Sequence, residues 1–318
     1  MKIGLSQLFD PRLIPLVDST RAFYEKRGMG RGPSSWNELL SIRDAAKPPA
    51  PSSPPAVAEV VGHGDRTVPV RIHFPTSIVP RGVFLDIHGG GFYMGSAAGS
   101  DVRNRELADT LGIVVVSVDY RLAPENPWPA APDDCETAAL WLAEHAADRF
   151  GTRRLAIGGS SAGATLAMTT LVRLRDCGVA AFSAAVLQFG TYDLSGQTPS
   201  GRLIADEYFI EAYAGQAPDR THPDLSPIYA DPANLPPVLI IVGEEDILLR
   251  DNLAMATQLS AAGVEVDLCV YPAAPHGFTG HATAMASAAL DDLHTWLDGQ
   301  LGREGRRGRR ETLTRGCV

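Results

Sequence analysis

The sequence predicts an α/β fold with a mostly parallel central sheet of about eight strands, flanked by helices and covered by a helical lid. Three observations support this prediction. Short apolar runs alternate with stretches of helical periodicity through most of the chain after residue 57. Most of these runs are almost continuously apolar, as expected for strands that are covered on both faces. One long segment, residues 194–228, interrupts the alternation.

The composition excludes several classes of protein. The chain has 318 residues, of which 45% are hydrophobic and 20% charged, as in a soluble globular protein. Its formal net charge of -9 argues against nucleic acid or an anionic membrane as the main partner. No segment is long and apolar enough to span a bilayer. The cysteines show no CxxC pair and no histidine at metal-ligand spacing, so we expect no metal and reduced thiols in a cytoplasmic protein: Cys135, Cys177, Cys269 and Cys317.

The N-terminal part is expected to be helical and to be separated from the main body by a linker. Residues 1–45 read as one or two amphipathic helices and form the N-terminal lid segment. Asp10, Pro11 and Arg12 interrupt its apolar stretch, which therefore does not resemble a signal peptide. Residues 46–56 hold the proline-rich sequence "KPPAPSSPPA", which suits neither a helix nor a central strand. The apolar side of the first helix is expected to comprise Leu13, Ile14, Leu16 and Val17.

Residues 57–193 and 229–301 are expected to form the core. The runs at 57–64 and 67–74 flank a short polar turn and predict an antiparallel hairpin. Because the later strands alternate with helices, we expect them to be mostly parallel with right-handed crossovers. The strand sequences are "GVFLDIH", "GIVVVSVDY", "RLAIGGS", "FSAAVLQFG", "PPVLIIVGEED" and "VDLCVYPAA". The helical sequences are "SDVRNRELADTLG", "APDDCETAALWLAEHAADRFG", "AGATLAMTTLVRLRDCG", "RDNLAMATQLSAAG" and "HATAMASAALDDLHTWLDGQL".

Two segments lie outside this alternation. Residues 194–228 are too long for a simple crossover and contain a helical pattern around Tyr208 to Tyr213. We expect this insertion to join the N-terminal helices in a lid over the strand ends. Residues 302–318 are basic, glycine-rich and without apolar periodicity, so disorder is their expected state, with a phosphate-binding or nucleic-acid-binding tail as the alternative.

The sequence "GSSAG" at residues 159–163 follows a predicted strand and precedes a predicted helix. This is the strand-turn-helix context of a nucleophile elbow, in which a sharp turn exposes a serine hydroxyl. Gly159 and Gly163 avoid a collision between a Cβ and the neighbouring backbone. Ser161 has glycine two positions away on each side, whereas Ser160 does not, so Ser161 is the candidate nucleophile. The alternative is an ordinary glycine-rich turn.

A serine nucleophile needs a general base, and a base needs an orienting acid. Glu244, Glu245 and Asp246 cluster at the end of one predicted strand, and His276 follows the next strand. The order serine, acid, histidine is that of an α/β-hydrolase triad. Asp246 is favoured because a helix is predicted to begin just after it, and Glu245 stays the alternative. The remaining histidines outside the glycine loop are expected to be surface or hydrogen-bonded residues: His63, His73, His145, His222, His281 and His294.

The sequence "HGGGF" at residues 88–92 also follows a predicted strand. Ester cleavage passes through a tetrahedral oxyanion, which backbone N–H groups can stabilise. Glycines offer such groups without side chains in the way. We therefore assign the oxyanion hole to Gly90 and Gly91 with the N–H of Ala162, while His88 and Gly89 are structural parts of the loop. The alternative is a tight turn that merely requires glycine.

Together these motifs resemble the hormone-sensitive-lipase family of α/β-hydrolases, which is rich in bacterial carboxylesterases. The resemblance covers roughly residues 57–300 and rests on "HGGGF", "DYRLAPENPWPAAPDD" (119–134), "GSSAG", "DILLRD" (246–251) and "HGF" (276–278). It implies the α/β-hydrolase fold, a lid built from an N-terminal segment and a later insertion, and structural roles for Arg121 and Glu125. The site residues it implies are Ser161 as nucleophile, His276 as base, Asp246 as acid, and Gly90, Gly91 and Ala162 as oxyanion donors. Ser160 departs from the aspartate common at that position.

The predicted function is a serine carboxylesterase that hydrolyses small to medium acyl esters through an acyl-enzyme intermediate. Such a reaction requires neither a metal nor an organic cofactor, and the partner is a small-molecule ester. A monomer or a homodimer is expected. Two alternatives stay open: an acyltransferase or lyase with the same triad, and a non-hydrolytic ligand-binding protein on the same fold. The sequence leaves the natural substrate and its acyl chain undetermined.

Overall fold

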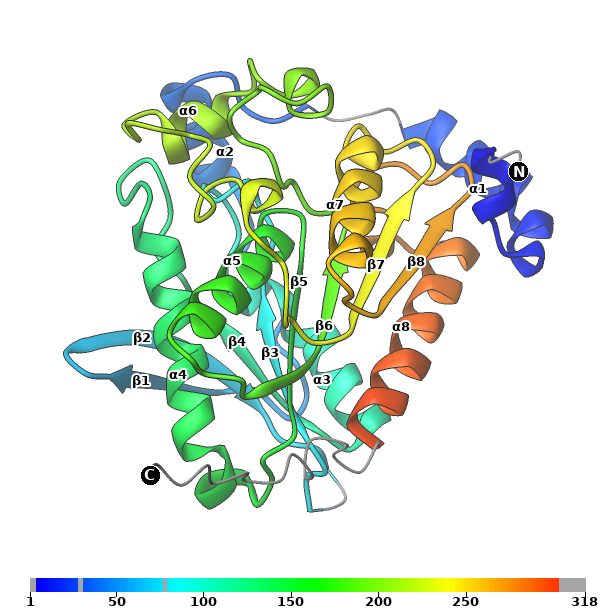
Figure 1. Cartoon of the computed structure of the whole chain (residues 1–318). Helices are drawn as coiled ribbons and strands as arrows, with labels where there is room; N and C mark the ends of the chain where they lie inside the picture. Colours follow the sequence, from blue (N-terminus) through cyan, green and yellow to red (C-terminus); the bar gives the residue numbers. More distant parts are fainter. Residues whose placement is uncertain (1–3, 28–30, 77–78, 303–318) are drawn as a thin grey trace, which may run out of the picture.

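Figure 1 shows the computed structural model, which describes residues 4–27, 31–76 and 79–302. An eight-stranded sheet forms its centre, in the order β1-β2-β4-β3-β5-β6-β7-β8. β1 and β2 form the predicted antiparallel hairpin and β2 also runs antiparallel to β4, while the remaining pairs are parallel. The strands are β1 Val57–His63, β2 Arg66–His73, β3 Val83–Ile87, β4 Val114–Val118, β5 Leu155–Ser160, β6 Phe182–Gln188, β7 Val238–Gly243 and β8 Val266–Tyr271. The predicted mostly parallel sheet is confirmed.

The strand register gathers the loops that carry the predicted chemistry. Ile87, the last residue of β3, pairs with Gly159 of β5, and Ser160 at the end of β5 pairs with Gln188 of β6. Because parallel strands end at the same edge of a sheet, the segments that follow β3, β5, β6, β7 and β8 become neighbours there. Residues far apart in the sequence therefore meet at one edge.

Helices cover both faces of the sheet (Figure 1). On one face lie α4 (Ala130–Phe150), α5 (Ala162–Asp176) and α7 (Leu249–Ala261), which share one buried cluster. On the other face, α3 (Asp101–Leu111) packs against α8 (Ala284–Gly302). Both α3 and α4 end at a glycine with positive φ, Gly112 and Gly151, the backbone conformation that commonly stops a helix.

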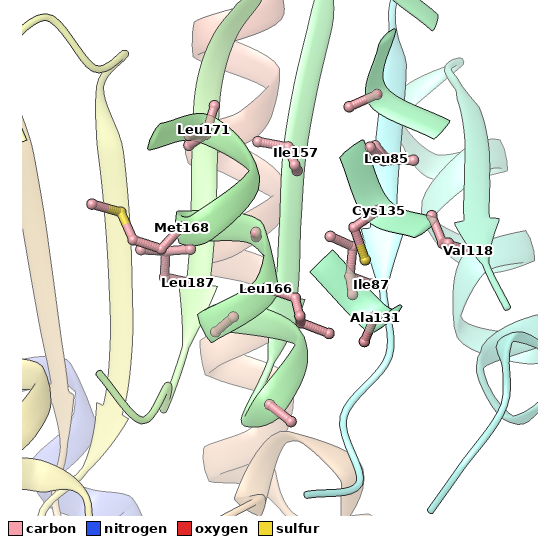
Figure 2. Packing of buried hydrophobic residues seen from close by; sticks show 14 of the residues in the cluster. Leu85, Ile87, Val118, Ala131, Cys135, Ile157, Leu166, Met168, Leu171 and Leu187 are labelled. Atoms are coloured by element: carbon pink, nitrogen blue, oxygen red, sulfur yellow. The ribbon is translucent and has the colours of Figure 1, made fainter. Parts of the chain in front are cut away.

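The core between α4, α5 and the sheet is tightly packed (Figure 2). Leu166, Met168 and Leu171 of α5 lie over the strands, and their side chains are at most 4% exposed. Strands β3, β4 and β7 are buried along their whole length, which agrees with their continuous apolar sequence. Cys135 is buried in this core, Cys177 is exposed and Cys269 is half-buried, while Cys317 lies outside the described residues.

The N-terminal segment divides between two places instead of forming one body. Two 3-10 helices, Leu5–Leu8 and Pro11–Leu16, lead into α1 (Val17–Arg27), which packs against α8 (Figure 1). α2 (Trp36–Ala45) contacts a different part of the molecule, because Arg43 donates to the carbonyl of Tyr93. The predicted apolar side was partly wrong, because Leu13 is buried but Ile14 is 53% exposed. A 3-10 helix has three residues per turn, so the α-helical period places Ile14 incorrectly.

The linker and the insertion have the following local structure. Residues 46–56 contain neither helix nor strand. The insertion carries α6 (Tyr208–Ala214), with short 3-10 helices at Gly201–Leu203 and Pro227–Tyr229. The predicted disordered tail lies outside the described residues except for Gly302. Across the described part of the chain, we find no helix with the length and apolarity needed to cross a membrane.

Candidate active site

Ser161 occupies a sharp turn between β5 and α5. Its backbone has φ 53° and ψ -122°, a conformation that side-chain-bearing residues rarely adopt, and its N–H donates to the carbonyl of Gln188 at 2.8 Å. A Cβ at Gly159 or Gly163 would lie 2.4 or 2.0 Å from the carbonyl oxygen of Ile87, so both positions require glycine. The turn therefore projects the Ser161 hydroxyl beyond the sheet edge, as the "GSSAG" motif predicts.

Three side chains form a continuous hydrogen-bonded chain at this edge. The Oγ of Ser161 lies 3.0 Å from Nε2 of His276, and Nδ1 of His276 lies 3.0 and 3.1 Å from the carboxylate oxygens of Asp246. The Asp246 side chain is fully buried and also accepts a bond from the N–H of Leu248 at 2.8 Å. Since a carboxylate accepts hydrogen bonds, Nδ1 carries the imidazole proton and Nε2 is free to accept from the serine hydroxyl.

The neighbouring acids do not reach the histidine. Glu244 turns toward the loop after β8 and accepts a bond from the N–H of Ala273 at 2.9 Å. Glu245 is exposed, and its carboxylate makes no hydrogen bond to any residue that the structure describes. Asp246 is therefore the acid in contact with His276, and the alternative assignment to Glu245 has no geometric support.

The glycine loop after β3 lies against the serine turn. Gly90 and Gly91 have φ values of 122° and 60°, and a Cβ at Gly90 would lie 2.1 Å from the carbonyl oxygen of Met94. A Cβ at Gly89 would approach the carbonyl of Ser160 to 2.6 Å, so this glycine lets the loop contact the turn. The N–H groups of Gly90 and Gly91 have no acceptor among the described residues. They are available to an incoming carbonyl oxygen.

A model of a family with the α/β-hydrolase fold matches residues 84–280. The chain belongs to the hormone-sensitive-lipase family of α/β-hydrolases. Carboxylesterase NlhH of Mycobacterium tuberculosis is 34% identical over 245 residues, which cover 72% of this hydrolase and 77% of the relative. An ethyl acetate hydrolase of Pseudomonas putida is 35% identical and covers 67% of this chain and 71% of its own.

Solved structures give the same result. A bacterial heroin esterase matches with a TM-score of 0.78 and 27% identity, covering 91% of the hydrolase and 99% of that chain. An esterase from the archaeon Pyrobaculum calidifontis matches with a TM-score of 0.75 and 28% identity, covering 92% and 98% respectively. The similarity therefore extends over nearly the whole length of the solved structures.

His88 of the hydrolase is buried at the start of the glycine loop. It is 4% exposed, its ring stacks on Tyr120 with centroids 4.1 Å apart, and its Nδ1 lies 2.7 Å from the carbonyl oxygen of Gly89. Burial lowers the pKa of His88, which favours the neutral ring. Tyr120 donates its hydroxyl to the His88 carbonyl at 3.0 Å. These contacts hold the start of the glycine loop.

The charged residues of the "DYRLAPENPWPAAPDD" segment brace neighbouring elements. Arg121 forms an ion pair with Asp134 at 2.8 Å, and Glu125 forms one with Arg43 of α2 at 2.6 Å. Arg43 also donates to the carbonyl of Tyr93 at 2.6 Å. The predicted structural roles of Arg121 and Glu125 agree with these contacts, which tie the segment and α2 to the glycine loop.

Sequence reasoning missed the contribution of the segment after β6. Phe189 has a positive φ of 40°, and its ring meets that of His276 edge to face, with centroids 5.1 Å apart. Gln188 accepts a hydrogen bond at 3.0 Å from Thr279, which lies three residues beyond His276. The position of these residues at a strand end was a usable signal, because ligands in parallel sheets lie beyond such ends.

Ser161 and His276 line a cavity of about 710 Å³, together with the glycine loop and Ala162. Residues from the N-terminal segment and from the insertion complete its wall, among them Tyr24, Ile204 and Phe209. The insertion packs on the glycine loop, since Tyr213 stacks on Phe92 with centroids 3.9 Å apart. Among the described residues, no three His, Cys, Asp or Glu side chains are grouped closely enough to hold a metal ion.

Proposed function

We propose that the protein is a serine carboxylesterase that hydrolyses small to medium acyl esters through an acyl-enzyme intermediate. The family and its relatives, which include a carboxylesterase and an ethyl acetate hydrolase, identify the activity as hydrolysis of carboxylic esters. The observation that carries the mechanism is the hydrogen-bonded chain from Ser161 through His276 to Asp246. It opens into the same cavity as the glycine loop.

In the first half-reaction, Ser161 Oγ attacks the ester carbonyl carbon while Nε2 of His276 accepts the hydroxyl proton. The buried carboxylate of Asp246 holds the imidazole in the required tautomer and stabilises the imidazolium that forms. The tetrahedral intermediate collapses when His276 returns the proton to the leaving alkoxide, so that alcohol departs and the acyl group stays on Ser161. Water then attacks the acyl-enzyme by the same route and releases the acid.

The oxyanion of each tetrahedral intermediate lies within reach of three backbone N–H groups in this proposal, those of Gly90, Gly91 and Ala162. Ala162 is the first residue of α5, so its N–H has no partner within the helix. The positive end of the helix dipole favours negative charge at the same place. His88 and Gly89 contribute by fixing the loop, and Gly159 and Gly163 by fixing the turn.

The alternative activities receive no support from a specific observation. An acyltransferase or lyase would use the same triad, but the relatives reported above are named as ester hydrolases. A non-hydrolytic receptor would not need the assembled chain of Ser161, His276 and Asp246. Ester hydrolysis with water as the acceptor is therefore the proposed reaction.

The setting of the enzyme is part of the same proposal. The substrate is a small-molecule ester, nucleic acid is not a partner, and the protein acts in the cytoplasm as a monomer or homodimer. Residues 1–45 and 194–228 act as a lid over the core formed by residues 57–193 and 229–301, with residues 46–56 as linker. Contacts of α2 and α6 with the glycine loop support this division.

Replacement of Ser161 tests the proposal directly. Ser161→Ala should abolish hydrolysis of a short p-nitrophenyl ester and labelling by a fluorophosphonate, with an unchanged far-UV circular dichroism spectrum. Ser160→Ala is the matched control, because it removes the adjacent hydroxyl and should keep both labelling and most of the turnover. Substantial activity in Ser161→Ala would show that another group is the nucleophile.

A further inference from the structure

The cavity around Ser161 contains charged groups that ester hydrolysis itself does not use. Besides histidines, five ionisable charged side chains line it: Arg27, Arg31, Arg103, Glu207 and Glu245. Three of the five are arginines, although the whole chain has a formal net charge of -9. The formal charges of these five side chains sum to +1, whereas the whole protein is negative.

Arg103 is the least exposed of the three arginines, and it forms no ion pair shorter than 3.7 Å with the described residues. Its side chain is 32% exposed, and its Nη2 lies 3.3 Å from the Oγ of Ser100 and 3.7 Å from Oδ1 of buried Asp86. The other oxygen of Asp86 already accepts bonds from Asn104 and Ser117, both at 2.8 Å. Since a guanidinium has five N–H donors, Arg103 is held in place but keeps donors for a ligand.

Arg27 provides a second cation on the cavity wall. It ends α1, and no acid within the described ranges forms an ion pair with it, whereas Arg31 pairs with Glu38 at 2.9 Å. His281 lines the same cavity, and burial together with the Arg27 charge lowers its pKa. His281 is fixed by the Tyr24 hydroxyl, which lies 3.0 Å from its Nδ1. The lowered pKa favours the neutral ring, so the positive charge that this wall offers to a ligand is that of the arginines.

Arg27 and Arg103 belong to two helices that share a packing partner. Both α1, which carries Arg27, and α3, which carries Arg103, pack against α8. The acids belong to other elements: Glu207 immediately precedes α6 in the insertion, and Glu245 lies between β7 and α7. Both acids are exposed, as is Arg27, so water screens these three charges more strongly than that of half-buried Arg103.

We propose that Arg103 and Arg27 form a subsite for a carboxylate of the substrate, so that the preferred esters carry a negative charge. This inference rests on the proposed esterase function and specifies its substrate class. A guanidinium binds a carboxylate through charge-assisted hydrogen bonds, which are stronger than neutral ones and fix orientation. The overall negative charge of the protein disfavours anionic ligands, so the attraction has to come from this wall.

Two pairs of esters test the charge preference and locate the carboxylate. The acyl pair is monoethyl glutarate and the same ester with an isopropyl group in place of the carboxylate. The alcohol pair is the acetyl ester of a terminal hydroxybutyrate and its isopropyl counterpart. Hydrolysis is followed at constant pH by alkali uptake. In at least one of the two pairs, kcat/KM for the anionic ester should exceed that for the neutral ester about tenfold, and that pair shows whether the carboxylate belongs to the acyl or the alcohol part. Added salt should reduce this ratio.

Three variants connect the ratio to the proposed residues. Arg103→Met and Arg27→Met should each lower the anionic-to-neutral ratio of kcat/KM, by about tenfold for Arg103. Loss of Arg103 beside buried Asp86 could unfold the protein, but Arg27 is exposed, so Arg27→Met should fold and its ratio of kcat/KM can be measured. Arg21→Met is the matched control, because it removes one charge from the same helix outside the cavity and should keep the wild-type ratio.

The possible results separate this inference from the esterase proposal. If the anionic ester is not preferred in either pair, or if neither Arg103→Met nor Arg27→Met changes the ratio, the carboxylate subsite is overturned while hydrolysis itself stands. If the wild-type protein cleaves neither the four esters nor a p-nitrophenyl ester, the esterase proposal and the subsite are overturned together.

Discussion

Phe189 meets the imidazole of His276 edge to face, with ring centroids 5.1 Å apart and planes inclined by 73°. The contact fixes the ring from one side, while Asp246 holds Nδ1 and Ser161 lies at Nε2. Phe189 itself is anchored, because its N–H donates to the carbonyl of Ile241 at 2.7 Å. The orientation of the base therefore depends on β6 as well as on the triad.

Phe189→Ala is expected to lower kcat about fivefold, because an aromatic pair contributes about 1 kcal/mol and its loss lets the imidazole leave its reactive orientation. KM should change less than kcat. Steady-state kinetics with p-nitrophenyl butyrate would measure both constants. Phe74→Ala is the control, since Phe74 packs on Phe150 and does not line the cavity. Equal kcat values for Phe189→Ala and the wild type would refute this positioning role.

Asp246→Asn is expected to lower kcat on the order of 10⁴-fold with little change in the fold, because an amide cannot stabilise the imidazolium and favours the wrong tautomer. The matched variant is Glu245→Gln, which neutralises the adjacent acid that makes no side-chain hydrogen bond within the described part of the chain. It should retain most of the activity. If Glu245→Gln loses more activity than Asp246→Asn, the acid has been assigned incorrectly.

Gly90→Ala is expected to lower kcat at least about 10²-fold, the usual cost of losing an oxyanion donor. The added Cβ would meet the Met94 carbonyl oxygen and displace the loop. Gly99→Ala is the control, because a Cβ at Gly99 meets no atom within 4 Å. Thermal unfolding of both variants separates a displaced loop from a damaged fold. Full turnover in Gly90→Ala would rule out the glycine loop as the oxyanion site.

Asp251 predicts a pH dependence of stability. It is 1% exposed and accepts bonds from the N–H groups of Tyr192 and Asp193 at 2.5 and 3.3 Å. Burial raises the pKa of Asp251 to about 6, with a further contribution from the charge of Asp193. A raised carboxyl pKa stabilises the protein below the unfolded value of 3.8, and this stability is lost as the pH rises through about 6.

Asp251→Asn keeps an oxygen acceptor but carries no charge, so it lacks this pH dependence. As the pH rises from about 4.5 to 7.5, the free energy of unfolding of Asp251→Asn minus that of the wild type should increase by about 2 kcal/mol. Urea unfolding across this range measures the difference. Asp65→Asn, in the exposed hairpin turn, serves as the comparison and should show no such trend. A constant difference between Asp251→Asn and the wild type would contradict the prediction.

The strand and helix pattern could be predicted because it depends on local periodicity. The six apolar runs after the hairpin form strands β3 to β8, and the helical pattern around Tyr208 forms α6. The N-terminal region was harder, since its 3-10 helices break the α-helical period and expose Ile14. The separation of α1 from α2 depends on which partner each helix packs against, and no local pattern records that.

The site divides in the same way. The identity of Ser161, His276 and the glycine loop follows from motifs, because a strained turn and a loop in contact with backbone both require glycine at fixed spacing. Whether Glu245 or Asp246 contacts His276 depends on the direction in which each side chain points after β7. The conformation of the adjoining loop sets that direction. Phe189 lacks a motif altogether, and its contact with His276 exists because β6 lies between β5 and β7.

By itself, the sequence determined the elements, their order and the residues that carry the chemistry, since backbone sterics and apolar periodicity act over a few residues. Tertiary structure decided which side chains meet. Ser161 and His276 are 115 positions apart and touch because parallel strands end at one edge of the sheet. The same packing placed Arg103 and Arg27 on the cavity wall, because α1 and α3 both rest on α8.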